Sequence, residues 1–445
     1  MQFLLNRRRR RRRYTLEEII DIIDDGMGDD IDDELQDILD GLEDGSITLD
    51  EAINELIYLG VIPGELIPTP FPSTYWSVYV TTTEPNQPVQ INVLKKDYTA
   101  GGSSSIQVRF QGGPYVIRIP EDSLSAYTEF ARPGTYQIRI AGILRNQDRL
   151  EFDNSRDTVT ASLVSSVGVI QGIRNFQNAD KLFKDCTGLT TIPADLFSLV
   201  PEVLSFRDTF AGCTFLTSIP AVLFQNNVAA LTFEGVFMGC TRIVTIGTDL
   251  FRYNVAASEQ VVGEYTYYAF KDAFNGCGNL ATIPTDLFRY NVLAADHAFE
   301  DTFAGCLALT TVPTDLFRYN VLAGEDAFKE TFWTCLNLAT VPADLFRYNV
   351  AVSGQGYGAT FVDCINLVMR IDLWGSGNLQ SHFVGRTVNF ESFFKEFMFT
   401  MLAEGEAPAL WDVTGATLTG TDAFGGHSAA TLTNYADIPE AWGGP

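Results

Sequence analysis

A short motif, Phe-x-x-Cys, recurs through the second half of the chain and accounts for every cysteine in it. The seven copies are Phe183/Cys186, Phe210/Cys213, Phe237/Cys240, Phe274/Cys277, Phe303/Cys306, Phe332/Cys335 and Phe361/Cys364. Successive cysteines are 27, 27, 37, 29, 29 and 29 residues apart. A period in this range indicates a stacked array, because one such unit can bury its apolar face only against its neighbours.

The residues after each cysteine are also repeated, and one full copy reads Leu280, Ile283, Pro284, Leu287 and Phe288. This spacing predicts one short parallel strand plus a helical turn in each unit. Phe299 and Phe303 are four residues apart, so we expect them to share one face of that helical turn. After Cys364 the pattern decays, as expected for terminal repeats that cap a core.

The chain begins with two blocks of opposite charge. Residues 7–13 are an unbroken run of seven arginines: Arg7, Arg8, Arg9, Arg10, Arg11, Arg12 and Arg13. Residues 14–60 then hold 17 Asp or Glu and no Lys or Arg. Apolar spacing predicts short helices over 15–24 and 48–60. The loop 40–51 partly resembles a calcium-binding EF-hand loop, but Leu42 stands where a ligand is needed, which favours a plain turn before a capped helix.

A proline-rich stretch over 63–72 separates this segment from a β-rich region. Alternating or β-rich runs at 76–80, 89–93, 106–110, 115–119 and 135–140, divided by Gly and Pro, predict a small antiparallel β-sandwich. We therefore divide the chain into an anchoring segment over 1–72, a sandwich over 73–157 and a repeat array over 158–445. The expected fold class is multidomain α/β plus β, with a short N-terminal helical segment, an antiparallel sandwich and a repeat solenoid.

The repeat unit Ala-Phe-x-x-Cys-x-x-Leu-x-x-Ile-Pro resembles BspA-type leucine-rich repeats, which occur in bacterial surface proteins and bacteriophage virion proteins. The run from Arg132 to Gly142 resembles the last strands of a PKD-like domain, which often precedes such repeats. The ending from Leu410 to Trp442 resembles the closing repeat of phage tail-fibre-like members. The resemblance implies a leucine-rich-repeat solenoid and a role in adhesion or in a virion.

Composition and motifs argue against catalysis. No phosphate-binding loop, zinc-protease helix, dinucleotide fingerprint or nucleophile motif is present, so we predict a non-enzyme without cofactor or metal. The cysteines lack metal-ligand spacing and fit a buried ladder of small apolar side chains better. A carbohydrate-active enzyme on a repeat scaffold remains the alternative, which a cleft with two facing carboxylates would favour.

Two groups of residues are candidates for binding. Four repeats read Asp-Leu-Phe-Arg-Tyr-Asn and place Arg252, Arg289, Arg318 and Arg347 at equivalent positions, which predicts either structural Asp–Arg pairing or a docking face for protein or glycan. The longer interval after Cys240 contains Tyr265, Tyr267 and Tyr268, an aromatic cluster in a loop. The arginine run is a candidate for assembly docking, and contact with nucleic acid is the alternative.

The predicted function is a bacteriophage virion component, such as a tail or head fibre or a capsid decoration, and the alternative is a bacterial surface adhesin. We expect no signal peptide and no transmembrane segment. The formal charge of −26 disfavours nucleic acid and anionic membranes as partners of the body of the protein. The expected partners are other virion proteins through the N-terminal segment, a host protein or glycan, and further copies of this chain. The expected location is the virion, assembled in the cytoplasm of a bacterial host.

Overall fold

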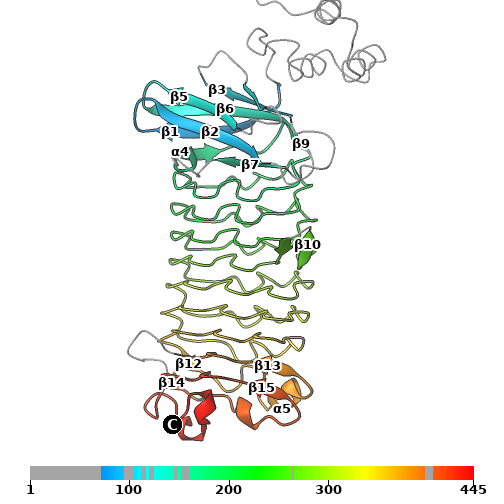
Figure 1. The fold of residues 1–445 in the computed structure, drawn as a ribbon, viewed down its shortest axis with the longest axis vertical. Coiled ribbons are helices and arrows are strands. Elements are labelled where there is room, and N and C mark those ends of the chain that lie inside the picture. The colour runs from blue at the N-terminus through cyan, green and yellow to red at the C-terminus, as the bar shows by residue number, and fades with distance from the viewer. Residues whose placement is uncertain are drawn as a thin grey trace, which may run out of the picture.

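The computed structural model describes residues 72–94, 105–111, 117–119, 125–144, 148–152, 160–262, 265–377, 379–395 and 404–445. It shows an elongated molecule in which a small β-domain lies at one end and a stack of coils extends from it (Figure 1). The predicted helices at 15–24 and 48–60, the loop at 40–51 and the arginine run lie outside the described residues.

The β-domain is built from two sheets. The larger has the strand order β4-β3-β6-β1-β8, with β9 paired to β6, and the smaller has the order β5-β2-β7. The strands of the larger sheet are β1 (Trp76–Thr82), β3 (Ser105–Phe110), β4 (Ile117–Ile119), β6 (Gly134–Ile143), β8 (Val164–Val167) and β9 (Ile173–Arg174). Those of the smaller are β2 (Gln87–Leu94), β5 (Ser125–Phe130) and β7 (Arg149–Phe152). All pairs are antiparallel except β6–β9.

Alternation of apolar residues explains the core between these sheets. In β1 every second residue is buried, which points Trp76, Val78 and Val80 inward. Trp76 also donates its indole N–H to the Gly168 carbonyl at 3.0 Å. The short helix α4 (Thr160–Leu163) leads into β8. The Trp76 ring lies 5.8 Å from that of Phe183, so the core of the β-domain continues into the first coil.

Each repeat forms one coil, and the interior of the stack is made of aromatic columns. In the column that contains the motif phenylalanine, successive rings such as Phe274, Phe303 and Phe332 stack at 5.6 and 5.8 Å. A second column, which includes Phe270 and Phe299, repeats at 6.0 Å. A third column contains Phe288 and packs against the second at a tilt. Offset or tilted ring contacts at these distances add to the stabilisation from burial.

The predicted fold class is wrong for the part of the chain that the structure describes. Only two short α-helices occur there, α4 and α5 (Leu379–Phe383), and neither belongs to a repeated Phe-x-x-Cys unit. The repeats consist of turns joined by isolated parallel bridges such as Ser218↔Thr245 and Thr245↔Thr282, and the sheets are small. These coils do not form a closed leucine-rich-repeat solenoid of strands and helices.

The backbone shows why no helix forms between the two phenylalanines of a unit. Between Phe206 and Phe210, Asp208 has φ 54°, and Gly212 follows with φ 74°. A left-handed residue every four positions interrupts a right-handed helix. Alternate N–H groups, including those of Phe206, Asp208 and Phe210, therefore donate to carbonyls of the next coil, whereas those of Thr209 and Ala211 close tight turns.

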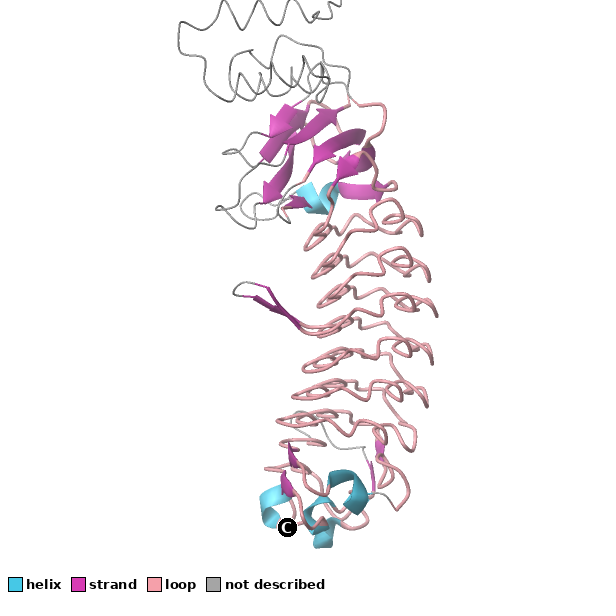
Figure 2. Ribbon diagram, turned by 90° about the vertical axis from the view of Figure 1, so that its right-hand side faces the viewer, coloured by secondary structure: helices cyan, strands magenta, loops and turns pink. Residues whose placement is uncertain are grey.

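The stack ends in an irregular region rather than a further repeat (Figure 2). It contains the parallel pairs β12 (Val368–Met369) with β14 (Glu404–Gly405) and β13 (Thr387–Asn389) with β15 (Thr417–Thr419). The same region holds three 3₁₀ turns, of which η1 (Leu410–Asp412) precedes β15 and η2 (Tyr435–Asp437) and η3 (Glu440–Trp442) follow it. Trp442 is 8% exposed and contacts the rings of Phe390 and Trp411, so the chain end covers the last aromatic layer.

Candidate interaction surfaces

The four Asp-Leu-Phe-Arg-Tyr-Asn repeats lie one above another and form a ladder on one side of the stack. Within each rung, the arginine pairs with the aspartate three residues before it. The N···O distances are 3.1 Å for Arg252–Asp249, 3.2 Å for Arg289–Asp286, 3.2 Å for Arg318–Asp315 and 3.3 Å for Arg347–Asp344. The arginine side chains remain 43–45% exposed, so each pair contributes little to stability.

Each guanidinium in the first three rungs also lies between two tyrosine rings. Arg289 is 5.8 Å from the ring centre of Tyr290 in its own rung and 5.0 Å from that of Tyr319 in the next. Arg252 and Arg318 repeat this arrangement. Cation–π contacts of this kind hold the side chains in a fixed order. Because Tyr290 and Tyr319 each have two arginines against their rings, these tyrosines offer edges and hydroxyl groups rather than open faces for stacking on a sugar.

A column of exposed valines runs beside the arginines and tyrosines. It consists of Val228, Val255, Val292, Val321 and Val350, which are 44–58% exposed. Leu293 and Leu322, 47% and 50% exposed, follow two of these valines in the sequence. We call the Asp–Arg pairs, the tyrosines of the same rungs and this valine column the ladder face.

Buried asparagines hold the ladder face to the stack. Asn320, which precedes Val321, donates from Nδ2 to the carbonyls of Phe288 and Asn291 at 3.0 Å each. Asn254, Asn291 and Asn349 make the equivalent pair of bonds, and all four are fully buried. Their hydrogen bonds to buried carbonyls fix the backbone from which the exposed residues project.

Two of the three tyrosines of the long interval, Tyr265 and Tyr267, belong to a hairpin that stands out from the stack, and Tyr268 follows it directly (Figure 2). The hairpin is formed by β10 (Gln260–Val262) and β11 (Tyr265–Tyr267). Tyr267 is only 6% exposed and lies 5.9 Å from the Arg207 guanidinium, while Tyr268 lies near Lys271 and His297. These two tyrosines therefore fasten the base of the hairpin to the stack. The side chain of Tyr265 lies outside the described part.

The hairpin base rests on a second ladder, one of alternating charge, which the sequence analysis missed. Its successive residues are Arg207, Glu234, Lys271, Glu300 and Lys329. Arg207 lies 3.4 Å from Glu234, and Glu300 accepts from Lys271 at 2.8 Å and Lys329 at 3.1 Å. His297 Nδ1 adds a 2.7 Å contact to Glu300. These residues all stand three positions before the motif phenylalanine, and that alternation was the signal available in the sequence.

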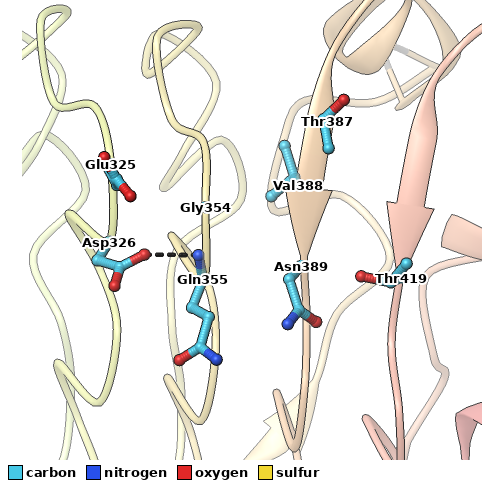
Figure 3. Close-up of a pocket in the computed structure, with 8 residues that line it drawn as sticks. All are labelled: Glu325, Asp326, Gly354, Gln355, Thr387, Val388, Asn389 and Thr419. Carbon is cyan, nitrogen blue, oxygen red and sulfur yellow. Dashed lines mark hydrogen bonds between the residues drawn. The ribbon is translucent and has the colours of Figure 1, made fainter.

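A shallow depression of about 540 Å³ lies where the last regular coils meet β13 and β15 (Figure 3). Its lining consists of Glu325, Asp326, Gly354, Gln355, Thr387, Val388, Asn389 and Thr419. The Asp326 carboxylate accepts the Gln355 backbone N–H at 2.5 Å. Glu325 and Asp326 are neighbours on one coil, so the lining does not hold two carboxylates facing each other, as glycoside hydrolysis requires.

The motif cysteines are buried and reduced. Cys213 donates its Sγ–H to the Phe183 carbonyl of the previous coil at 3.1 Å, and the other cysteines from Cys240 onward repeat this bond. Burial raises the pKa of the Cys335 thiol to about 12, which keeps it protonated. Among the described residues, no group of three or more His, Cys, Asp or Glu is placed to hold a metal ion.

Of the helices in the described segments, none is both long and apolar enough to cross a membrane. Comparison of the chain with protein-family models, with curated proteins and with solved structures gives no match. The resemblance to BspA-type repeats and PKD-like domains therefore stays a prediction.

Proposed function

We propose that the protein is a non-enzymatic component of a bacteriophage particle, a fibre-like appendage or capsid decoration that presents a repeated surface to a partner. The observation that supports this most is the ladder face, where four identical rungs are held in fixed order by buried asparagines and by arginines packed between tyrosines. A repeated rigid surface suits many weak contacts acting together.

The elongated form of the described residues supports the same proposal. A β-domain at one end and irregular turns at the other leave the flanks of the stack as the largest surface (Figure 1). The arginine run at residues 7–13 precedes the β-domain, and we propose that it docks on an acidic surface of the particle. A host protein or glycan is the partner that we propose for a flank of the stack other than the ladder face.

Fractionation of the source culture tests this function. An antibody against the repeat region is used on immunoblots across a density gradient, alongside a tagged variant in which Arg7 to Arg13 are all serine. We expect the natural protein to migrate with capsid protein and the serine variant to remain in the unassembled fraction. Arg289→Ser, on the ladder face, is the matched control and should still assemble. Recovery of the natural protein only in the cell envelope would overturn the proposal and leave a surface adhesin.

A further inference from the structure

The ladder face differs from the rest of the molecule in its charge. The chain as a whole has a formal charge of −26, so two copies repel each other over most of their surfaces. The four rungs carry four aspartates and four arginines, which sum to zero. A second acidic copy can therefore approach this face without the net repulsion that it meets from the whole chain.

The same face exposes apolar area in a continuous pattern. The valine column extends over five successive coils, from Val228 at 54% exposed to Val350 at 58%. Single exposed apolar residues are ordinary on protein surfaces, but aligned ones mark interaction sites. Nothing in the described chain covers this column, so a binding partner is needed to remove it from water.

The polar residues beside the valines are those that favour contacts between proteins. Each rung contributes an arginine and a tyrosine, and no lysine stands in the repeated Asp-Leu-Phe-Arg-Tyr-Asn-Val segment. Tyrosine and arginine are enriched at protein interfaces and lysine is depleted there. Their positions are already fixed by the stacking of Arg289 and Arg318 on neighbouring tyrosines, so little side-chain freedom is left to lose on binding.

We propose that the ladder face is the site at which a second copy of this chain binds. Every rung offers both a cation and an anion, so the face is complementary to itself, as a two-fold interface requires. The valine columns of the two copies form the apolar centre of the contact, and the Asp–Arg pairs form its polar rim. This inference does not depend on the particle to which the protein belongs.

Analytical ultracentrifugation of the full chain, over a range of micromolar concentrations, tests the proposal. We expect a reversible dimer, and we expect Val292→Glu to weaken it at least tenfold. Val244→Glu is the matched control, because Val244 is 46% exposed, against 44% for Val292, but stands in a different column. The control should dimerise as the natural chain does. A chain that is monomeric throughout, or an equal loss in both variants, overturns the proposal.

A charge exchange tests the self-complementarity directly. Replacing the four rung arginines by Asp leaves every rung negative, and replacing the four rung aspartates by Arg leaves every rung positive, so the signs are opposite whichever rungs meet across the two-fold axis. Each variant alone should dimerise more weakly than the natural chain, and an equimolar mixture should recover most of the dimer. Circular dichroism of each variant checks that it is folded. A mixture that is no more associated than the separate folded variants would show that the rungs do not meet across an interface.

Discussion

At the scale of single residues, the least ordinary environment is that of Asp301. It stands beside Glu300 and in the column of Asp272 and Glu330, one coil on either side. Burial first, and then the charges of Asp272, Glu330 and Glu300, raise the pKa of the Asp301 carboxyl to about 8. Glu300 has the opposite shift: hydrogen bonds from Lys271, His297 and Lys329 lower its pKa despite burial. Two neighbouring carboxyls therefore have different charges at neutral pH.

The raised pKa of Asp301 predicts how the stability of the fold changes with pH. The folded-state pKa of Asp301 lies above its unfolded value, so its contribution is complete below about pH 4 and is lost as the pH rises toward 8. The loss is at most about 1.4 kcal/mol for each pH unit. Asp301→Asn keeps the size of the side chain, and asparagine tolerates the left-handed backbone. The free energy of unfolding, measured by urea titration at several pH values between 5 and 8.5, should therefore fall less steeply with pH in this variant than in the natural chain.

Asp195→Asn, at an exposed position, is the control for that titration and should keep the natural slope. If Asp301→Asn also leaves the slope unchanged, the carboxyl of Asp301 is ionised in the folded protein at neutral pH and the assignment is wrong.

At the scale of the coil, residues with a left-handed backbone conformation (positive φ) decide that each unit forms tight turns and not a helix. The position two residues after each motif phenylalanine has positive φ throughout, and it is Gly239, Gly276 and Gly305 in three successive coils but Thr334 in the next. Glycine adopts this conformation without strain, whereas a β-branched residue does not. A Cβ at Gly305 would make ordinary contact with its surroundings, with Gly276 Cα 3.5 Å away. The difference between these residues is thus mainly one of backbone strain.

Exchanging the two residue types should therefore change stability in opposite directions. We expect Thr334→Gly to raise the free energy of unfolding by about 0.5–1 kcal/mol, since relief of strain outweighs the added freedom of the unfolded chain. Gly305→Thr should lower it by about 1–2 kcal/mol. The midpoints of the urea unfolding curves measure both changes, provided that the dependence of the free energy on urea concentration stays the same. Destabilisation by Thr334→Gly would mean that the hydrogen bond from its hydroxyl to the Trp333 carbonyl matters more than the strain.

The same residues show what the sequence could and could not predict. The strand segments at 76–80, 89–93, 106–110 and 135–140 all lie within strands, because their alternation reflects burial on one side. The repeat period was visible, but Phe299 and Phe303 were assigned to a helix on spacing alone. Asp301 between them, with φ 55°, excludes that helix. The Asp–Arg pairs followed from local spacing, whereas the stacking of Arg289 on Tyr319 joins separate coils and could not be seen in one repeat.

At the scale of the whole molecule, the stack depends on how its two ends are closed. Each coil buries its aromatic residues against its neighbours, so the first and last coils need other partners. At the start, Trp76 and Phe152 of the β-domain cover Phe183. At the other end, residues 404–445 supply β15, which pairs with β13, and Trp442, which covers Phe390. At both ends, ordered backbone also covers the N–H and C=O groups of the terminal coil, which could otherwise pair with another chain.

Removal of residues 404–445 should therefore make the chain associate through its exposed last coil. It exposes Phe390 and Phe393, which Trp442 and Phe424 now contact, and it leaves β13 without its parallel partner. Light scattering of the truncated chain should show added association that grows with concentration, because the exposed last coil of one copy can pack against that of another. This association should persist when Val292→Glu is added, which separates it from association through the ladder face. Truncation of 443–445 alone keeps Trp442 and is the control. A chain without residues 404–445 that associates no more than the natural chain would show that the last coil is stable uncovered.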